Sequence, residues 1–232
     1  MTASAPSPTN DRPPGWTPPD PLPDGLRTRR LVIRAYQPGD ARALFEAIDR
    51  SRASLLPWLP WAATQHLNSQ QSAESIDLFR RVAAERPMRP EHNAVFGYVL
   101  GIFRADDGAL VGGTGFNRIV YESADAETGY WLAADACGRG YCTEAVGALI
   151  DWGLRPARDG GWGLRRVRIF AAAANVASCA VPRRLGLREE ARFVRDRWVP
   201  GHGWCDTIGW GLTVYEPMPR ALGSDAMPRS GR

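Results

Sequence analysis

The stretch ETGYWLAADACGRGYCTEA (residues 127–145) places a strand, a turn and a helix in sequence. AETGYWL (126–132) predicts the strand, because it is rich in aromatic residues. YCTEAVGALIDWGL (141–154) predicts a helix with Ala145, Leu149 and Trp152 on one side. The first turn of a helix leaves backbone N–H groups without partners at the positive end of the macrodipole. The turn between the two elements is therefore predicted to bind an anion.

The composition of this turn suits a phosphate group. Gly138 and Gly140 let the backbone close around an oxygen because they carry no Cβ, and Arg139 adds positive charge. Thr143 adds a hydroxyl, but it stands where G-x-G-x-x-G requires its third glycine, and G-x-x-x-x-G-K-[ST] is not matched either. Nucleotide hydrolysis and dinucleotide redox chemistry are thus disfavoured. A Gly-Arg-Gly turn can also be purely structural, so its neighbours must support any functional assignment.

The remaining pattern of the chain predicts helices around a sheet. Before the quoted stretch we expect a strand, two helices and the arms of a hairpin, at 29–36, after Asp40, from Ser72, and at 94–103 and 109–120. After it we expect a strand, a short helix and two closing strands, at 164–174, from Asn175 to Gly186, and at about 189–199 and 205–214. This order predicts an α/β (α+β) fold with a mixed sheet and one parallel crossover at its centre. Trp152, Trp198 and Trp210 are expected to pack in the core.

The two ends of the chain differ in composition from its middle. Residues 1–26 contain eight of the 19 prolines, interleaved with Ser, Thr, Asp and Gly, and are expected to form a disordered lead-in. The segment 217–232 has a similar composition and is expected to be a disordered tail. The folded domain is therefore predicted to span 27–216.

Composition and charge exclude several classes of protein. The net charge of +4 comes from arginines scattered along the chain, which makes nucleic-acid binding unlikely. The four cysteines form no C-x-x-C pair and lie far from the three histidines, so no metal site is expected, and reduced thiols fit a cytoplasmic enzyme. The N-terminus lacks the features of a signal peptide, and no segment approaches 18 uninterrupted apolar residues, so neither export nor membrane insertion is expected.

Several motifs occur together in the order found in one known family. ETGYWL, GYCTEA and the loop LLPWLPWA (55–62) accompany the glycine turn, and Asn175, Ser178 and LGL (185–187) follow about 35 residues later. With these motifs, residues 28–215 resemble the GNAT superfamily of acetyl-CoA-dependent N-acetyltransferases, within it the RimJ/RimL-type branch that acetylates ribosomal-protein N-termini. The family turn reads Q/R-x-x-G-x-G/A. Here both glycines match, but Asp135 replaces the leading Gln or Arg.

The resemblance implies how acetyl-CoA is held. The central sheet of this family is mostly antiparallel, and its two parallel middle strands, here 126–132 and 165–172, splay apart to admit the coenzyme. Backbone groups near Leu132 and Ala133 would pair with the pantetheine arm, residues 138–143 would hold the pyrophosphate, and Asn175 would bond to the arm. Asn175 could equally cap the following helix, and both roles are compatible. The implied coenzyme-binding residues are Leu132, Ala133, Gly138, Arg139, Gly140, Tyr141, Cys142, Thr143, Asn175 and Ser178.

Acetyl transfer requires a neutral amine, a polarised thioester carbonyl and a proton for the departing thiolate. Glu127 is the candidate base, because the resemblance places the acceptor amine at the start of this strand. It could also be a solvated carboxylate at the strand edge. Glu144 is a weaker candidate, since the first turn of a helix favours Glu for electrostatic reasons alone.

The acid that protonates the thiolate is not assigned by the sequence. Many superfamily members use a tyrosine seven residues after the asparagine, but here that position is Pro182. The RimJ/RimL branch usually lacks this tyrosine as well. Ser178 or a water molecule is the remaining candidate, although Ser178 could be an ordinary serine of the first helical turn.

The acceptor is expected to be a primary amine, in particular the N-terminal α-amino group of a protein such as a ribosomal protein. Trp58 and Trp61 are candidates for walling the acceptor cleft, although packing in the core would explain either of them. Two alternatives remain open. The acceptor could be a small-molecule amine, such as an amino acid, a polyamine or an antibiotic, since a fold does not decide this. The protein could also be a non-catalytic acetyl-CoA-binding regulator.

Overall fold

The structure is a computed structural model that describes residues 16, 25–85 and 97–214. Its α-helices are α1 (Ala41–Asp49), α2 (Arg52–Leu55), α3 (Ser69–Glu85), α4 (Tyr141–Leu154) and α5 (Val176–Arg184). Its strands are β1 (Leu26–Arg27), β2 (Leu31–Ala35), β3 (Tyr98–Arg104), β4 (Leu110–Val120), β5 (Asp125–Leu132), β6 (Arg166–Ala172), β7 (Arg188–Val199) and β8 (Gly203–Thr213). No helix in these ranges combines the length and the apolar character needed to cross a membrane.

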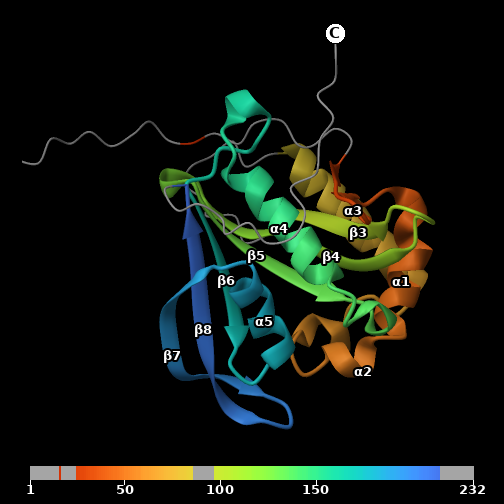
Figure 1. Ribbon diagram of the computed structural model, residues 1–232. Helices are drawn as coiled ribbons and strands as arrows, with labels where there is room; N and C mark the ends of the chain where they lie inside the picture. Colours follow the sequence, from red (N-terminus) through yellow and green to blue (C-terminus); the bar gives the residue numbers. More distant parts are fainter. Residues whose placement is uncertain (1–15, 17–24, 86–96, 215–232) are drawn as a thin grey trace, which may run out of the picture.

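The described strands form one sheet in the order β1-β2-β3-β4-β5-β6-β8-β7. All neighbours are antiparallel except β5 and β6, which run parallel at the centre of the sheet. These two strands pair over only three residues, from Asp125 opposite Arg166 to Glu127 opposite Arg168. Beyond Glu127 they separate, as Figure 1 shows. The predicted α/β (α+β) fold, with a mostly antiparallel sheet and splayed parallel middle strands, is confirmed.

The helices divide between the two faces of the sheet. α4 crosses one face and α5 lies beside it, in front of the sheet in Figure 1. On this face Phe116 of β4 stacks against Trp152 of α4, with ring centroids 6.4 Å apart. On the opposite face Tyr36, directly after β2, packs against Phe79 of α3 at 6.1 Å. α1 and α3 thus cover β2–β4 on that second face.

Aromatic side chains form a large part of the core. Phe116 and Trp162 stack with centroids 5.1 Å apart at 12°, and Trp152 lies 5.4 Å from Trp162. Trp152 and Trp210 are 4% and 1% exposed, which confirms their predicted packing. The same prediction is wrong for Trp198, which is 61% exposed and stands edge-on to Trp204 on the β7–β8 hairpin.

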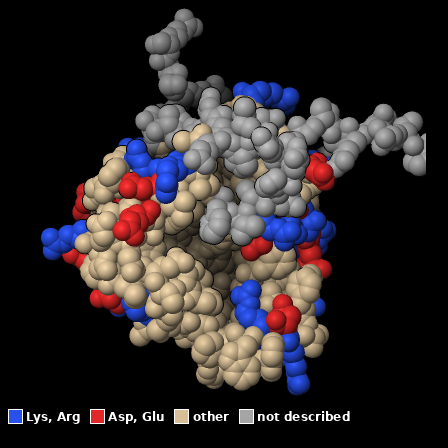
Figure 2. Space-filling model, turned by 180° about the vertical axis from the view of Figure 1, so that it is seen from behind, with Lys and Arg blue, Asp and Glu red and all other residues tan. Residues whose placement is uncertain are grey.

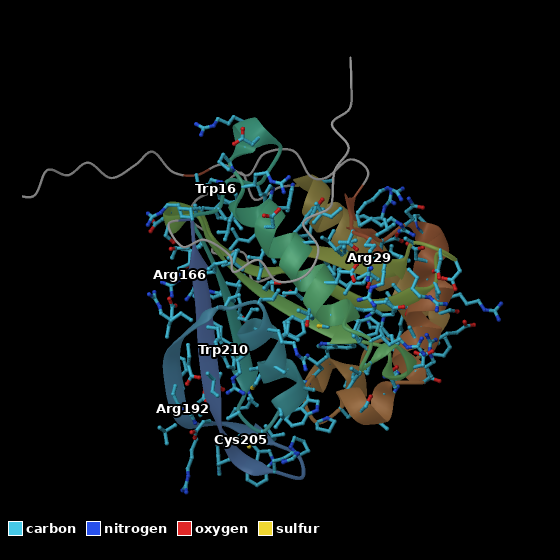
Figure 3. The ribbon with its side chains drawn as sticks, viewed as in Figure 1. Trp16, Arg29, Arg166, Arg192, Cys205 and Trp210 are labelled. Atoms are coloured by element: carbon cyan, nitrogen blue, oxygen red, sulfur yellow. The ribbon has the colours of Figure 1, made fainter. Side chains whose placement is uncertain are left out.

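Two described residues near the N-terminus belong to the folded domain. Trp16, labelled in Figure 3, donates a hydrogen bond from Nε1 to the carbonyl of Trp162 at 3.0 Å. Its ring also packs edge-on against the Trp162 ring. Leu26 begins β1. The indole of Trp16 therefore adds to the aromatic core. The rest of 1–24 and the tail 217–232 lie outside the described residues, as do 94–96 of the expected hairpin arm.

Some element boundaries also differ from the prediction. α3 begins at Ser69 rather than Ser72, and Asn68 Oδ1 accepts a hydrogen bond from the backbone N–H of Gln71 at 2.9 Å. The stretch 55–62, expected to be irregular, contains the end of α2 and part of a 3₁₀ turn (Pro60–Ala63). Gly186 ends α5 at φ +69°, as its predicted role requires.

Candidate active site at the splayed strands

The gap between β5 and β6 exposes backbone groups of β5. The N–H of Ala133 donates to the carbonyl of Val111 at 2.9 Å, toward β4. Because backbone groups alternate in direction along a strand, the N–H and C=O of Leu132 face the gap instead. The expected pairing with an extended ligand can therefore use Leu132, whereas the N–H of Ala133 is already engaged.

The glycine turn follows β5 and opens α4. Gly138 and Gly140 have φ of +75° and +77°, a left-handed conformation that favours glycine. A Cβ at Gly138 would meet no atom within 4 Å, so this side of the turn is open. The N–H groups of the first helical residues, Tyr141, Cys142 and Thr143, have no acceptor within the described residues. The turn thus presents free donors to an open surface.

An ion pair from the turn between β1 and β2 fixes the position of the glycine turn. Glu144 accepts hydrogen bonds from Thr28 Oγ1 at 2.6 Å, Arg30 Nε at 2.7 Å and the Arg30 backbone N–H at 3.0 Å. Arg30 Nη1 also donates to the carbonyl of Arg139 at 3.0 Å, and its guanidinium lies 4.8 Å from the centre of the Tyr141 ring. These bonds lower the pKa of Glu144 despite its partial burial. Glu144 is therefore engaged in holding the turn.

A small pocket of about 130 Å³ lies beside the turn. Arg50, Arg104 and Arg139 contribute to its lining. Arg50 Nε approaches Asp135 Oδ2 at 3.4 Å. Asp135 stands where the family turn has Gln or Arg, and it contacts an arginine that directly follows α1.

The N-terminus of α5 lies at the end of β6 and faces the gap from the other side. Asn175 Oδ1 accepts a hydrogen bond from the backbone N–H of Ser178 at 3.0 Å, so Asn175 caps this helix. Its side-chain NH₂ donates to no described residue. The capping role is therefore present, and the amide can still donate to a ligand.

Tyr130 spans the gap from β5 to α5, and sequence reasoning missed it. Its hydroxyl donates to the carbonyl of Ser178 at 2.9 Å and accepts from Ser178 Oγ at 3.3 Å. Burial raises the pKa of Tyr130 well above its usual value, so the hydroxyl stays protonated. The position of Tyr130 in GYWL was visible in the sequence, but its contact with a residue 48 positions away was not.

Glu127 lies where β5 and β6 separate, and it is half-buried. Within the described residues its carboxylate forms no hydrogen bond or ion pair. Burial raises its pKa, partly offset by Arg168, Arg118 and Arg197. A desolvated carboxylate without a fixed partner is suited to accept a proton.

Trp58 and Trp61, the candidates for walling the acceptor cleft, both make aromatic contacts. The ring centroids of Trp58 and His202 are 5.2 Å apart, and this contact joins the loop after α2 to the β7–β8 turn. Trp61 packs edge-on against Trp131 of β5 at 6.3 Å. Both Trp58 and Trp61 are half-buried, so each combines packing with exposed surface. Figure 2 shows a hollow in the face of the molecule that is seen from behind, with charged side chains on both sides of it.

Two thiols near the site, those of Cys142 and Cys179, are poorly suited to act as nucleophiles. Burial raises the pKa of Cys142 to about 12, and it also raises the pKa of Cys179. Both are therefore protonated at neutral pH, whereas a thiolate is the reactive form. Among the described residues there is no cluster of three His, Cys, Asp or Glu side chains that could hold a metal ion.

Comparisons with known proteins agree with this geometry. The Acetyltransferase (GNAT) domain family matches residues 30–188. The chain is 30% identical over 171 residues to YdaF of Bacillus subtilis (strain 168), named as a candidate ribosomal N-acetyltransferase, and the match covers 74% of this chain and 85% of YdaF.

Two solved structures share the fold. RimL, a ribosomal L7/L12 alpha-N-protein acetyltransferase in complex with coenzyme A, superposes with a TM-score of 0.67 at 21% identity, over 81% of this chain and 96% of RimL. The microcin C7 self-immunity acetyltransferase MccE, in complex with acetyl-CoA and AMP, superposes with a TM-score of 0.68 at 20% identity, over 83% and 97% of the two chains.

The fold and the family match define the protein as an acetyltransferase. The chain belongs to the GNAT acetyltransferase family, as its sequence motifs predicted.

Proposed function

We propose that this protein transfers the acetyl group of acetyl-CoA directly to a primary amine, namely the N-terminal α-amino group of a protein such as a ribosomal protein. The observation that carries this proposal is the separation of β5 and β6 immediately after Glu127. A gap that ends at an unpaired carboxylate brings a thioester and an amine to the same place. The names of YdaF and RimL support a ribosomal-protein N-terminus as the acceptor.

The residues around the gap fit acetyl-CoA. The free N–H groups at the start of α4, together with Arg139 and the Thr143 hydroxyl, would bind the pyrophosphate. Leu132 would pair with the pantetheine arm through its backbone, and the Asn175 amide would donate to it from the opposite side. Gly138, Gly140, Tyr141 and Cys142 complete the turn; they act through backbone groups and packing.

Glu127 would remove the proton of the acceptor amine. A free α-amino group has a pKa of about 7.7 to 8.0, so deprotonation at pH 7 costs about 1 kcal/mol, against more than 4 kcal/mol for lysine. The raised pKa of Glu127 makes it a stronger base than an exposed glutamate. This difference favours an N-terminus over a lysine side chain as acceptor.

The reaction is then a single displacement through a tetrahedral intermediate. The amine nitrogen bonds to the thioester carbonyl carbon, the C–S bond breaks, and the coenzyme sulfur leaves as a thiolate that takes up a proton. Backbone N–H groups of β5 that face the gap would polarise the carbonyl. Ser178 Oγ lies at the start of α5, is partly exposed and is held by Tyr130; it would relay a proton from solvent water to the thiolate and so remain a neutral hydroxyl. The protonated thiols of Cys142 and Cys179 support direct transfer without an acetyl-cysteine.

One alternative concerns the acceptor. MccE, named for microcin self-immunity, shares this fold, so a small-molecule amine remains a second candidate. The other alternative is a regulator that binds acetyl-CoA without turnover.

Coenzyme A release in the presence of acetyl-CoA and a panel of amines tests the proposal. The panel contains peptides with N-terminal Ala, Ser or Thr, the same peptides with a blocked N-terminus and an internal Lys, free amino acids, polyamines and aminoglycosides. We expect turnover with the free N-terminal peptides and a loss of about 10²-fold or more in kcat for Glu127→Gln. Glu46→Gln on α1 is the matched control, because Glu46 is exposed and, among the residues that the structure describes, pairs only with Arg42.

The outcomes separate the three hypotheses. Turnover confined to small amines would reject the N-terminal acceptor. Tight acetyl-CoA binding without turnover of any amine would favour the non-catalytic regulator. Full activity of Glu127→Gln would reject Glu127 as the base.

A further inference from the structure

The register of the sheet aligns two arginines with Glu127. Arg118 of β4 pairs with Glu127, and Glu127 pairs with Arg168 of β6. Directly paired residues share one face of a sheet, with Cα atoms about 4.5–5.5 Å apart on antiparallel strands. The carboxylate of Glu127 is therefore flanked by a guanidinium on each neighbouring strand. We call Arg118, Arg168 and Arg197 the arginine frame.

Arg197 completes this frame from β7. It pairs with Cys205 of β8, and its charge, with those of Arg168 and Arg118, offsets part of the rise that burial causes in the pKa of Glu127. A bulge between Phe193 and Arg197 shifts the register of β7 at this point. Phe170 of β6 and Phe193 of β7 pack together across β8, with ring centroids 6.2 Å apart.

The acidic residues nearby neutralise only part of this charge. Arg168 Nε bonds to Asp125 Oδ1 at 2.8 Å. Glu190 pairs with Arg166 and with Arg188. Arg118 and Arg197 form no ion pair within the described residues. Two guanidinium groups of the frame thus remain available beside the proposed base.

The side-chain amide of Asn117 also lies near Glu127. A Cβ at Gly129 would overlap the side chain of Asn117, so Asn117 lies over Gly129, two residues from Glu127 on the same face. Asn117 is exposed, and its side chain has no hydrogen-bond partner within the described residues. It therefore adds a neutral donor to the positive frame.

We infer that the arginine frame binds a carboxylate carried by the acceptor close to the amine that is acetylated. This inference rests on the proposed function. Successive residues of an extended peptide are about 3.3–3.6 Å apart, so an Asp or Glu at position 2 or 3 brings a carboxylate within reach of the frame. Guanidinium groups bind carboxylates through paired N–H donors, which makes arginine suited to this recognition.

The positive frame also acts on the amine. Three arginines disfavour a protonated amine beside Glu127 and so favour the neutral form that reacts. They also disfavour acceptors with Lys or Arg next to the N-terminus, which gives discrimination by repulsion as well as by attraction.

Matched acceptors test this inference with the full-length protein. Peptides beginning Ala-Asp and Ala-Asn, otherwise identical, are compared for kcat/KM, together with a second pair that differs at position 3. Free alanine and alaninamide form another arm, because a carboxylate could also come from a free amino acid. We expect about a tenfold preference for the carboxylate member of at least one pair, decreasing as ionic strength rises.

Substitutions of Arg118 test whether the arginine frame causes the preference for the carboxylate peptide. Arg118→Gln is expected to reduce the ratio within the preferred pair to about one, and Arg118→Lys to retain part of it. Arg158→Gln, an exposed arginine in the turn after α4 that pairs with Asp159, should keep the wild-type ratio. Thermal melting of each variant shows whether it is folded.

Peptide binding in the presence of coenzyme A, followed by tryptophan fluorescence, is a second readout that does not depend on turnover. Equal affinity and equal kcat/KM within every pair would overturn the inference, as would a ratio unchanged in Arg118→Gln. If no amine is acetylated but the Asp peptide still binds more tightly, the carboxylate site stands and the proposed function fails. A preference for alanine over alaninamide alone assigns the carboxylate to a small-molecule acceptor.

Discussion

Replacing Glu144 by Gln tests whether its ion pair with Arg30, in the turn between β1 and β2, holds the glycine turn. Glu144 accepts three hydrogen bonds, from Thr28 and Arg30, and its side chain is 17% exposed. Glutamine keeps the size of the side chain but places an NH₂ group against donors. A hydrogen bond to a charged group contributes about 1.5–3 kcal/mol when buried. Because Arg30 is 37% exposed, solvent screens part of this energy.

We expect Glu144→Gln to lower the free energy of unfolding by about 2 kcal/mol. For a domain of this size, about 1 kcal/mol shifts the melting temperature by roughly 2–4 °C, so a decrease of about 4–8 °C follows. Thermal unfolding followed by circular dichroism measures this change. Glu46→Gln, whose pair with Arg42 is largely exposed, should change stability by no more than about 0.5 kcal/mol.

The pH dependence gives an independent check. The pKa of Glu144 is lowered in the folded state, so its contribution to stability is present above the unfolded pKa of about 4.3. That contribution is lost as pH falls through the folded pKa. The stability difference between wild type and Glu144→Gln should therefore be full at pH 7 and shrink below about pH 4.

The same variant should weaken coenzyme binding, because Arg30 also bonds to the carbonyl of Arg139. We expect the Kd for coenzyme A, measured by calorimetry, to rise about tenfold. A melting temperature within 1 °C of wild type, together with an unchanged Kd, would refute the view that this ion pair positions the turn.

Three further outcomes follow from the site. Burial raises the pKa of Glu127 in the folded state, so ionisation of this carboxyl reduces stability as pH rises above about 4.3. The Glu127→Gln variant should therefore have a higher melting temperature than wild type at pH 7 and the same melting temperature at pH 3. A lower melting temperature of the variant at pH 7 would contradict this. Tyr130→Phe removes the hydroxyl that contacts Ser178 and should lower kcat about tenfold with little change in the KM for the acceptor. The control Tyr121→Phe, remote from the gap, should leave kcat unchanged. Equal kcat values for the two variants would exclude a role for the Tyr130 hydroxyl. Gly140→Ala forces a residue with a side chain into a left-handed conformation at a cost of about 1–2 kcal/mol, and it should weaken coenzyme binding about tenfold. Gly39→Ala is the control, because Gly39 lies at an open position without positive φ, and it should leave coenzyme binding unchanged. Calorimetric titration of both variants with coenzyme A measures the two affinities.

Much of the coenzyme side of the site could be predicted because its signals are local. Gly138 and Gly140 lie two positions apart in the turn, and both adopt the left-handed conformation that glycine favours. Asn175 was a natural helix cap, and it caps α5. Trp198 was misassigned because hydrophobic character alone does not separate a core indole from one exposed on a hairpin.

The acceptor side was less visible in the sequence, because it depends on strands distant along the chain. Arg118 and Arg168 lie 50 positions apart, and only the sheet register sets both beside Glu127. The register of β4 shifts between Phe116 and Arg118, which no rule of sequence periodicity indicates. Had the strands slipped by one residue, these side chains would face the opposite side of the sheet.

The sequence by itself determined the order of the elements, the glycine turn and the helix that follows it, because hydrophobic periodicity and backbone preferences act over a few residues. Only the tertiary structure decided how the site is completed: the separation of β5 and β6 after Glu127, the bond from Tyr130 to Ser178, and the anchoring of the turn by Arg30. Each of these brings together groups far apart in the chain. Their geometry depends on the packing of the whole sheet against its helices, which no local pattern encodes.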